Sequence, residues 1–410
     1  MDRPRLAIVG MGGYAQAHRR YVQQVEQQEL GKQVAQVAIP ADQEAFAADL
    51  AEMRQRQIMV FGSLREMLAQ AREHIDIVCI PTGIPLHRGM TVAALEAGCH
   101  VLVEKPAAGS IQDVDAMLNA ASRAQRRCAV GYQHIYQREF RRVKDWVCQG
   151  RLGAIRRIRA FGCWPRQPGY YARNGWAGRL AVDDTWVLDA PHNNALAHAV
   201  NAMLFMASPV PDAALCPAAV RAELYRINAI ESADTAALRV HTMEGPQVFF
   251  AVSHCTDRTL NPVFIMEGEK GHLEMTYEGK LQARFKDGTT QVVEVEEGPR
   301  RVLEDLAQVV AGERSALMCP LDMARMQTLC ACGTFESSAI HPLPQALRTV
   351  DPGSGTVVIR GMTEAVQQAW SEGALFSELG IDWAIPGDEI DLTGYTYFPS
   401  YRRRVGDAVP

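Results

Sequence analysis

The first third of the chain alternates short apolar runs with stretches of helical periodicity. Apolar runs at residues 6–9, 34–39, 58–61, 75–80 and 100–103 have the length of buried strands. The segments between them repeat apolar residues every three or four positions, which predicts helices over 13–28, 44–54, 64–72, 87–97 and 111–123. Strands that alternate with helices in this way pair in parallel, so the pattern predicts a doubly wound α/β sheet that ends near residue 125.

The pattern changes in the middle of the chain. Strand-length segments, several with polar–apolar alternation, occupy residues 219–295 and are separated by turns such as Lys286-Asp287-Gly288. A mostly apolar helix is predicted over 188–205, and further helices are predicted over 138–149, 301–311 and 322–338. We therefore expect an α+β domain with a large open, mainly antiparallel sheet over 126–345. A linker at 351–355 is expected to lead into a C-terminal extension, assigned to 346–410.

Composition narrows the class of protein. The chain has 410 residues, of which 48% are hydrophobic and 22% charged, as in an ordinary globular protein. A net charge of −5 argues against a nucleic-acid partner, and no apolar run is long enough for a membrane helix. The start of the chain shows no basic-then-apolar leader, so we expect a soluble, cytoplasmic protein. The ten cysteines form no CxxC pair, which favours free thiols and no metal site.

A glycine-rich turn follows the first predicted strand. Gly10-Met11-Gly12-Gly13-Tyr14-Ala15 has the GxGxxA pattern, in which the glycines permit a tight turn and close approach of a pyrophosphate to the backbone. The helix after it offers unpaired N–H groups to the anion. Residues 1–125 are therefore predicted to be a dinucleotide-binding Rossmann domain. The second strand ends in Ala38-Ile39-Pro40, with neither the usual ribose-binding acid nor an arginine, so NAD and NADP both remain open, with NAD slightly preferred.

A lysine stands at the end of another predicted strand. The strand over 100–103 continues into Glu104-Lys105-Pro106, and the loop over 80–87 leaves a neighbouring strand at the same edge. Ligands of doubly wound sheets bind outside the carboxyl ends of the strands. We therefore expect Lys105 to face the place where a nicotinamide would lie.

With these motifs the chain resembles the glucose–fructose oxidoreductase / inositol dehydrogenase / rhizopine catabolism (Gfo/Idh/MocA) family. The resemblance rests on GMGGYA at 10–15, IPTGIPLH at 80–87, AALEAGCHVLVEKP at 93–106 and GRLG at 150–153, and it extends over about residues 5–345. It implies an NAD(P)-dependent oxidoreductase that acts on a sugar, cyclitol or related polyhydroxy compound, and a homo-oligomer, either a dimer or a tetramer. It also implies a set of cofactor-binding residues: Gly10, Gly12, Gly13, Tyr14, Ala15, Pro81, Thr82, His87, Glu104, Lys105 and Gln133.

The resemblance assigns catalytic roles to Lys105 and His198 at the reacting carbon. The family's Asp-x-Gly-x-His-x-x-Asp helix is best matched by residues 194–201, where Asn194 and Asn201 replace the two acids. Residues 194, 198 and 201 would share one face of a helix. Asn194 can bind a substrate hydroxyl but cannot take its proton, so His198 is the expected general base or acid. A register that uses Asp189 and His192 fits the spacing less well, and a hydrogen-bonded core histidine is the alternative for His198.

The stretch over 164–178 is rich in aromatic and polar residues. In the family, the corresponding loop faces the nicotinamide and holds the substrate. The substrate-contact candidates in it are Tyr171, Arg173, Asn174 and Trp176, because planar hydrogen-bonding groups and aromatic faces suit polyhydroxy compounds. The alternative is a well-packed surface loop or a subunit contact. The C-terminal extension, with Tyr401-Arg402-Arg403-Arg404, is expected to cover either the substrate site or a subunit contact.

Three functions are compatible with these residues. The preferred one is hydride transfer between the nicotinamide and the substrate carbon. The second is an NAD-dependent glycosidase that uses transient oxidation, and the third is a non-catalytic dinucleotide- or sugar-binding sensor. The missing ribose acid and the asparagine at 194 are the features that favour a sensor.

Overall fold

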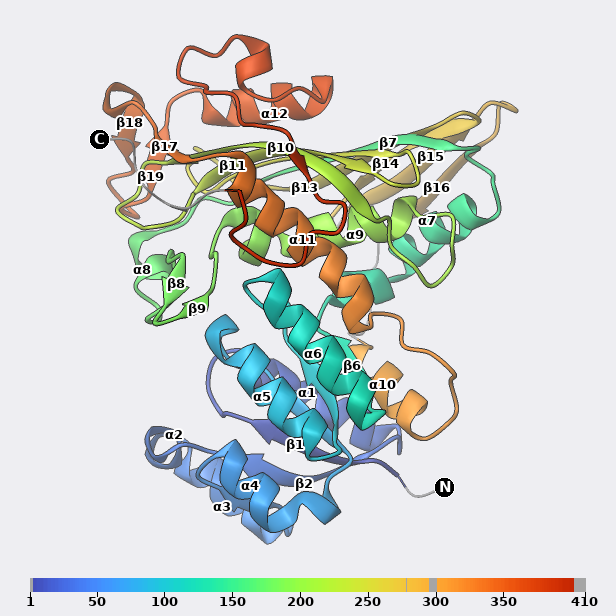
Figure 1. Ribbon diagram of the computed structural model, residues 1–410, viewed down its shortest axis with the longest axis vertical. Helices are drawn as coiled ribbons and strands as arrows, with labels where there is room; N and C mark the ends of the chain where they lie inside the picture. The colour runs from blue at the N-terminus through green and yellow to red at the C-terminus, as the bar shows by residue number, and fades with distance from the viewer. Residues whose placement is uncertain (1–2, 278, 295–300, 402–410) are drawn as a thin grey trace. The chain divides into compact units, whose positions relative to one another are not determined.

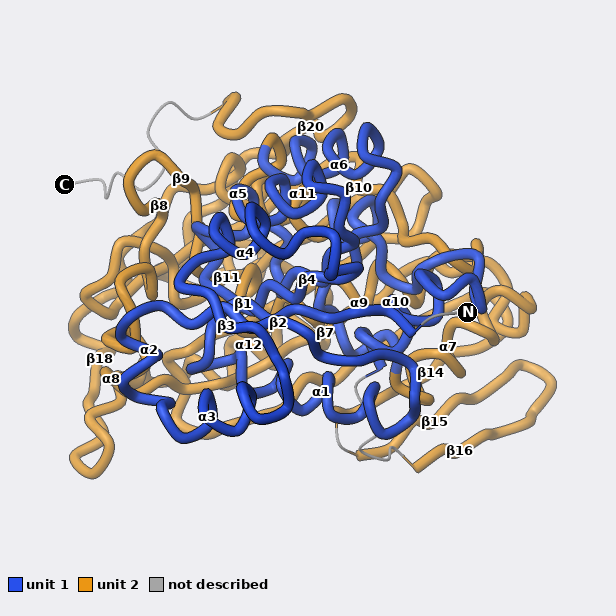
Figure 2. Tube along the Cα trace, turned by 90° about the horizontal axis from the view of Figure 1, so that it is seen from below, with its two compact units in different colours: residues 1–108, 113–136, 299–325 blue, residues 109–112, 137–298, 326–410 orange. Residues whose placement is uncertain are grey.

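The computed structural model describes residues 3–277, 279–294 and 301–401, which form two compact units (Figure 2). The first unit contains residues 1–108, 113–136 and 299–325, and the second contains residues 109–112, 137–298 and 326–410. The predicted domain boundaries at residues 125 and 345 stay predictions. Val295 and the arginines at 402–404, which entered the sequence analysis, lie outside the described residues.

The first unit is built on a parallel sheet of six strands in the order β3-β2-β1-β4-β5-β6. This is the strand order of a classic dinucleotide-binding fold, and it confirms the predicted doubly wound sheet. The strands are β1 (Arg5–Val9), β2 (Lys32–Val37), β3 (Met59–Phe61), β4 (Ile77–Ile80), β5 (His100–Val103) and β6 (Cys128–Val130). The central strands β1, β4 and β5 are almost wholly buried, because helices cover both faces of the sheet.

Figure 2 shows α5 and α6 on one side of these strands and α1 and α3 on the other. The helices of this unit are α1 (Ala15–Gln27), α2 (Pro40–Ala45), α3 (Ala47–Gln55), α4 (Leu64–Ala71), α5 (Ile84–Glu96), α6 (Ile111–Ala124) and α10 (Val302–Val310). Helix α10 comes from much later in the chain than the others and packs against α1 and β5.

The second unit is built on a sheet of ten strands. Its order is β16-β15-β14-β13-β7-β12-β11-β10-β17, with β20 paired to β10. Among the described strand pairs of this sheet, β7–β12 and β10–β17 are parallel and the others antiparallel, so the predicted large, mainly antiparallel sheet is confirmed. The strands are β7 (Ile155–Cys163), β10 (Pro217–Arg226), β11 (Thr235–Thr242), β12 (Gln247–Ser253), β13 (Leu260–Gly268), β14 (Gly271–Thr276), β15 (Lys280–Phe285), β16 (Thr290–Glu294), β17 (Ile340–Pro342) and β20 (Ile390–Asp391).

Helices cover both faces of this sheet at its centre. Figure 1 shows α12 (Met362–Glu372) on one face, and α7 (Arg138–Cys148) and α9 (Ala197–Ala207) on the other. Helix α12 contacts β7 and β12, and α9 contacts β7, β12 and β13. Strands β14 and β15 alternate buried and exposed side chains, as expected where one face of a sheet is solvated. A further helix, α11 (Leu321–Ser337), follows α10 in the chain.

Two predicted features of the second unit were wrong. The helix predicted over 188–205 is a short π-helical turn, Pro191–Ala195, followed by α9. A proline disfavours helical geometry at the residue before it, and Ala190, which precedes Pro191, is accordingly extended (φ −132°, ψ 164°). The linker predicted at 351–355 is instead the turn of a hairpin between β18 (Arg348–Val350) and β19 (Val357–Ile359). The Asp351 carboxylate accepts the N–H groups of Gly353 and Ser354, which makes this Asp-Pro-Gly segment a turn.

Among the described helices, none is long and apolar enough to span a membrane. All ten cysteines are free thiols, and only Cys148 and Cys216 are not buried.

Candidate functional site

The glycine turn at 10–15 has the geometry that the sequence predicts. Gly10 and Gly13 have positive φ angles of 93° and 56°, which side chains rarely adopt. The Gly10 N–H donates to the Val37 carbonyl at 2.9 Å, which fixes the turn to β2. Among the described residues, no acceptor receives the N–H groups of Gly12 and Gly13. These two donors, next to the N-terminus of α1, suit a pyrophosphate.

Two predicted cofactor residues from distant segments lie together at this turn. Tyr14, at the N-cap of α1, donates its hydroxyl to the Gln133 side-chain oxygen at 3.4 Å. Gln133 opens a short 3-10 helix after β6. The same hydroxyl lies 3.3 Å from the hydroxyl of Tyr21, which is seven residues further along the chain, in α1. The structure therefore brings the end of β6 to the glycine turn.

A buried carboxylate fixes the backbone of Lys105. One oxygen of Glu104 contacts Nε2 of His18 at 2.9 Å, and the other accepts the Lys105 N–H at 3.1 Å. His18 is fully buried on α1, and Glu104 is 5% exposed. Gly131 makes room for this carboxylate, because an added Cβ would lie 2.5 Å from the Glu104 oxygen. The segment before Lys105 is therefore fixed by α1 and by the end of β6.

The segment after Lys105 is fixed to the neighbouring strand. His87, buried at the start of α5, contacts the carbonyls of Pro106 and Thr82 at 2.9 and 3.0 Å. Burial is the largest influence on this ring and lowers the pKa of His87 despite the two carbonyls. A neutral ring donates one N–H to one of these carbonyls. The end of β4, with Pro81 and Thr82, is thereby joined to the loop that carries Lys105.

The end of β2 lacks a ribose-binding acid at the usual position. Ile39 is 52% exposed and precedes α2, whose first turn contains Asp42. Gln43 donates to the Ala38 carbonyl at 2.9 Å and closes this turn. The only charged side chains of residues 38–44 are those of Asp42 and Glu44, and both are negative.

In the second unit, two of the predicted substrate residues, Asn194 and Arg173, lie beside a buried carboxylate. Asp189 is 5% exposed and accepts the Asn194 side-chain amide at 2.7 Å and the Gly178 N–H at 2.6 Å. Arg173 lies 3.7 Å from the same carboxylate. Asp189 belongs to the less favoured register of the sequence analysis, and here it positions Asn194.

The aromatic stretch packs cations onto rings. The guanidinium carbon of Arg173 lies 3.8 Å from the centre of the Tyr170 ring and 5.0 Å from that of Trp176. Asn174 accepts the N–H groups of Trp176 and Ala177 at 3.1 and 2.8 Å, so its oxygen is used to fold its own loop. Arg173 and Trp176 therefore share a stacked cluster, whereas the Asn174 oxygen does not take part in it.

Tyr171 contacts a histidine that sequence reasoning did not select. Its hydroxyl lies 3.3 Å from Nδ1 of His254, which is 3% exposed and follows β12. Burial, with the nearby Arg166 and Arg173, holds the pKa of His254 well below the ordinary value. Burial likewise raises the pKa of Tyr171. Both groups are thus neutral near neutral pH, and the Tyr171 hydroxyl can donate to the imidazole.

His198 and its neighbours lie on different elements from those predicted. His198 and Asn201 are on α9, whereas Asn194 is in the π-helical turn before it, so the three residues do not lie on one continuous α-helix. Asn201 is fully buried. His192 is also buried, packs against Phe335, and has a pKa lowered to about 3 by burial. His192 is therefore a neutral core residue.

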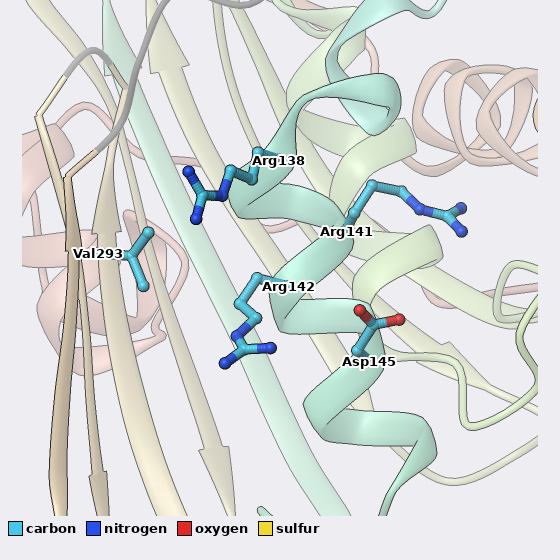
Figure 3. A pocket seen from close by; sticks show the side chains of 5 residues that line it. All are labelled: Arg138, Arg141, Arg142, Asp145 and Val293. Carbon is cyan, nitrogen blue, oxygen red and sulfur yellow. The ribbon is translucent and has the colours of Figure 1, made fainter.

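A separate hollow of about 320 Å³ lies in the second unit between α7 and β16. Figure 3 shows that its lining side chains come from one helix and one strand: Arg138, Arg141, Arg142 and Asp145, with Val293 opposite. It contains none of the predicted site residues. Within the described part of the chain, no group of three or more histidine, cysteine or acidic side chains is arranged to hold a metal ion.

Sequence reasoning missed three residues of these clusters. His18 lies on the buried face of α1, and the helical spacing of the apolar residues around it could have placed it there. Arg166 lies within the stretch that was singled out. His254 is 83 residues from Tyr171, and no local pattern connects the two.

Comparison with known proteins finds a family model that matches the N-terminal part of the chain. A family model described as "Oxidoreductase family, NAD-binding Rossmann fold" matches residues 4–132. The 1,5-anhydro-D-fructose reductase of Ensifer adhaerens is 34% identical over 121 residues, which are 28% of this chain and 36% of that protein. The D-glucoside 3-dehydrogenase of Escherichia coli is 30% identical over 152 residues, 37% of this chain and 41% of that protein. The alignments thus span less than half of these relatives.

Solved structures extend the similarity of fold to both units. The WlbA dehydrogenase from Chromobacterium violaceum, in complex with NADH and UDP-GlcNAcA, has a TM-score of 0.66 and 21% sequence identity. The match covers 81% of this chain and 93% of that one. At this identity the likeness describes the fold alone.

Proposed function

We propose that the chain, whose residues 4–132 match the model of the Gfo/Idh/MocA family of NAD-binding oxidoreductases, transfers a hydride between a nicotinamide cofactor and a sugar, cyclitol or related polyhydroxy compound. The observation that carries the proposal is the fixed backbone of Lys105 at the carboxyl end of β5. Glu104 and His18 hold it on one side, and His87 holds Pro106 on the other. The names of the reductase and dehydrogenase relatives support the substrate class.

The glycine turn is the proposed site of the cofactor's pyrophosphate. Gly12 and Gly13 would donate their N–H groups, and Tyr14 and Gln133 would lie beside the bound dinucleotide. The nicotinamide, when bound, supplies the hydride acceptor or donor. We favour NAD over NADP, because Asp42 and Glu44 after β2 would repel the additional phosphate of NADP and no cation stands with them.

Lys105 is the proposed electrostatic and proton-transfer group of the first unit. An ammonium beside a carbinol oxygen stabilises the negative charge that develops on it, or relays its proton. The bonds to Glu104 and His87 hold the backbone on either side of this residue before substrate binds. Such preorganisation avoids the cost of ordering the group during the reaction.

His198, with Asn194, is the proposed proton-transfer and hydroxyl-binding pair of the second unit. Imidazole exchanges protons near neutral pH, whereas the Asn194 amide only hydrogen-bonds. Tyr171, Arg173 and Trp176 are proposed to bind the rest of the substrate, and Asn174 to shape their loop. We also propose a homo-oligomer, which sedimentation at micromolar concentration tests; a monomer alone would refute it.

The proposal predicts that Lys105→Ala lowers kcat by about a hundredfold or more, the contribution typical of a positioned proton-transfer group. Reduction of NAD⁺ would be followed by fluorescence with a panel of hexoses, cyclitols and sugar acids. Lys286→Ala, an exposed turn residue, serves as the matched control and should keep full activity. His198→Asn should flatten the pH–rate profile. Unchanged turnover in Lys105→Ala, or dinucleotide binding without turnover on any substrate, would contradict hydride transfer as the function.

A further inference from the structure

Arg166 is a half-buried cation for which the described residues provide no acidic partner. It follows β7, and its backbone N–H donates to the His254 carbonyl at 3.2 Å. Its guanidinium carbon lies 4.4 Å from the centre of the Tyr170 ring and 5.3 Å from that of Trp164. Within the described part of the chain, no carboxylate lies within ion-pairing distance of it, and its Nε is shielded from solvent without a hydrogen-bond partner. The two terminal nitrogens of this guanidinium have no hydrogen-bond partner among the described residues either, and unlike Nε they are not shielded, so their N–H groups can bind an anion.

A second guanidinium lies on the same ring. Arg173 is 3.8 Å from the Tyr170 centre, and its ion pair with Asp189 is long, at 3.7 Å. The Asp189 oxygens already accept closer hydrogen bonds from Asn194 and Gly178. Two cations therefore share one ring, with a single carboxylate that is largely engaged elsewhere.

Two further titratable groups beside Tyr171, His254 and Asp234, do not offset this charge. His254 has a depressed pKa, caused by its burial and by both arginines, and its Nε2 is buried without a partner. Asp234, the other buried carboxylate beside Tyr171, accepts the N–H groups of Ile227 and Asn228, at 3.0 and 2.9 Å. The Asp234 carboxylate is thus hydrogen-bonded to the backbone at residues 227 and 228 and does not pair with either arginine. Arg173 donates to the Tyr170 carbonyl and lies near Asp189, so the cation of this cluster that has no acidic partner among the described residues is Arg166.

We infer that the substrate carries an anionic group, a carboxylate or a phosphate, and that it is bound beside the Tyr170 ring by Arg166, with Arg173 adding to the positive charge there. The planar fork of a guanidinium matches both anions with paired, charge-assisted hydrogen bonds, and a ring beneath it holds it flat. The inference rests on the proposed function for the role of this cluster as the substrate site. It narrows the substrate class from polyhydroxy compounds in general to sugar acids or sugar phosphates.

The test is calorimetric titration of the full chain, saturated with NAD⁺, with D-glucose, D-gluconate, D-glucuronate and a hexose phosphate as probes. At least one anionic probe should bind at least tenfold more tightly than D-glucose, with an affinity that falls as salt is added. The gluconate and glucuronate arms, set against the phosphate arm, distinguish the two anions. Arg166→Gln should weaken anion binding at least tenfold, and Arg166→Lys should restore part of it, because the charge returns without the fork.

The matched control is Arg142→Gln, taken from the other group of arginines (Figure 3). It should leave anion binding unchanged. Equal affinities for D-glucose and all anionic probes, or loss of anion binding in Arg142→Gln but not in Arg166→Gln, would overturn the inference. Binding that depends on Arg166 without any reduction of NAD⁺ would support the inference while contradicting the proposed hydride transfer, so the two failures are distinguishable.

Discussion

Gly131→Ala tests whether the buried Glu104 carboxylate controls the position of Lys105. Gly131 directly follows β6, and its N–H donates to the Val103 carbonyl at 2.9 Å. A Cβ at this position would lie 2.5 Å from one Glu104 oxygen and 2.7 Å from its carboxyl carbon. Neither the β6 backbone nor the short Glu104 side chain can yield without cost, so the carboxylate must move away from His18 and from the Lys105 N–H.

The expected effects differ between stability and activity. Overpacking of this kind costs about 1–3 kcal/mol of unfolding free energy. Because a displacement of about 1 Å in a reacting group can cost roughly 100-fold in rate, kcat should fall by about this factor even where the variant is fully folded. Urea unfolding measures the first quantity, and NADH formation measures the second under conditions where the variant is fully folded.

Gly89→Ala is the matched control for this substitution. Gly89 lies inside α5, and an added Cβ there meets no atom within 4 Å. Alanine in a helix interior is about 1 kcal/mol more favourable than glycine, so this variant should be slightly stabilised and fully active. If Gly131→Ala kept both the wild-type stability and the wild-type kcat, the argument that Glu104 positions Lys105 would be wrong.

Two further predictions concern buried groups of the second unit. Burial lowers the pKa of His192 to about 3, so below pH 6.5 the unfolded chain binds a proton that the folded chain does not, and stability is lost as the pH falls from 6.5 toward 3. His192→Leu should therefore flatten the acid limb of stability, by up to about 1.4 kcal/mol per pH unit in urea titrations; an unchanged slope would refute the burial argument. Tyr171→Phe removes the partner of His254 Nδ1 and should lower the unfolding free energy by about 1–2 kcal/mol and raise the substrate KM, whereas unchanged values of both would place the hydroxyl outside the site.

The local motifs were predictable because their chemistry is encoded in neighbouring residues. The turn at 10–15 needs glycine at its positive φ angles, and Lys105 follows a strand whose end must lie at the ligand edge of a parallel sheet. The alternation of apolar and polar residues in β14 and β15 likewise follows from one face of each strand being buried. These features require no knowledge of distant contacts.

Other features depend on contacts that sequence spacing does not contain. The helix predicted over 188–205 failed because Pro191 forces extended geometry on Ala190, and apolar periodicity alone does not register this. Helix α10 belongs to the first unit although it comes late in the chain, and Tyr171 contacts His254 across 83 residues. Both contacts join segments that are distant in sequence, so no local pattern predicts them. The role of Asp189 was judged by α-helical spacing, but its carboxylate accepts a hydrogen bond from Asn194 in the π-helical turn before α9.

The most direct test of the central claim follows the hydride itself. The purified protein would be incubated with NAD⁺ and a sugar or sugar acid that carries deuterium on its carbinol carbons, and the reduced cofactor would be analysed by mass spectrometry. Direct transfer predicts that the deuterium appears at the reactive carbon of the nicotinamide. Reduced cofactor without deuterium, or no reduced cofactor with any bound substrate, would contradict the account.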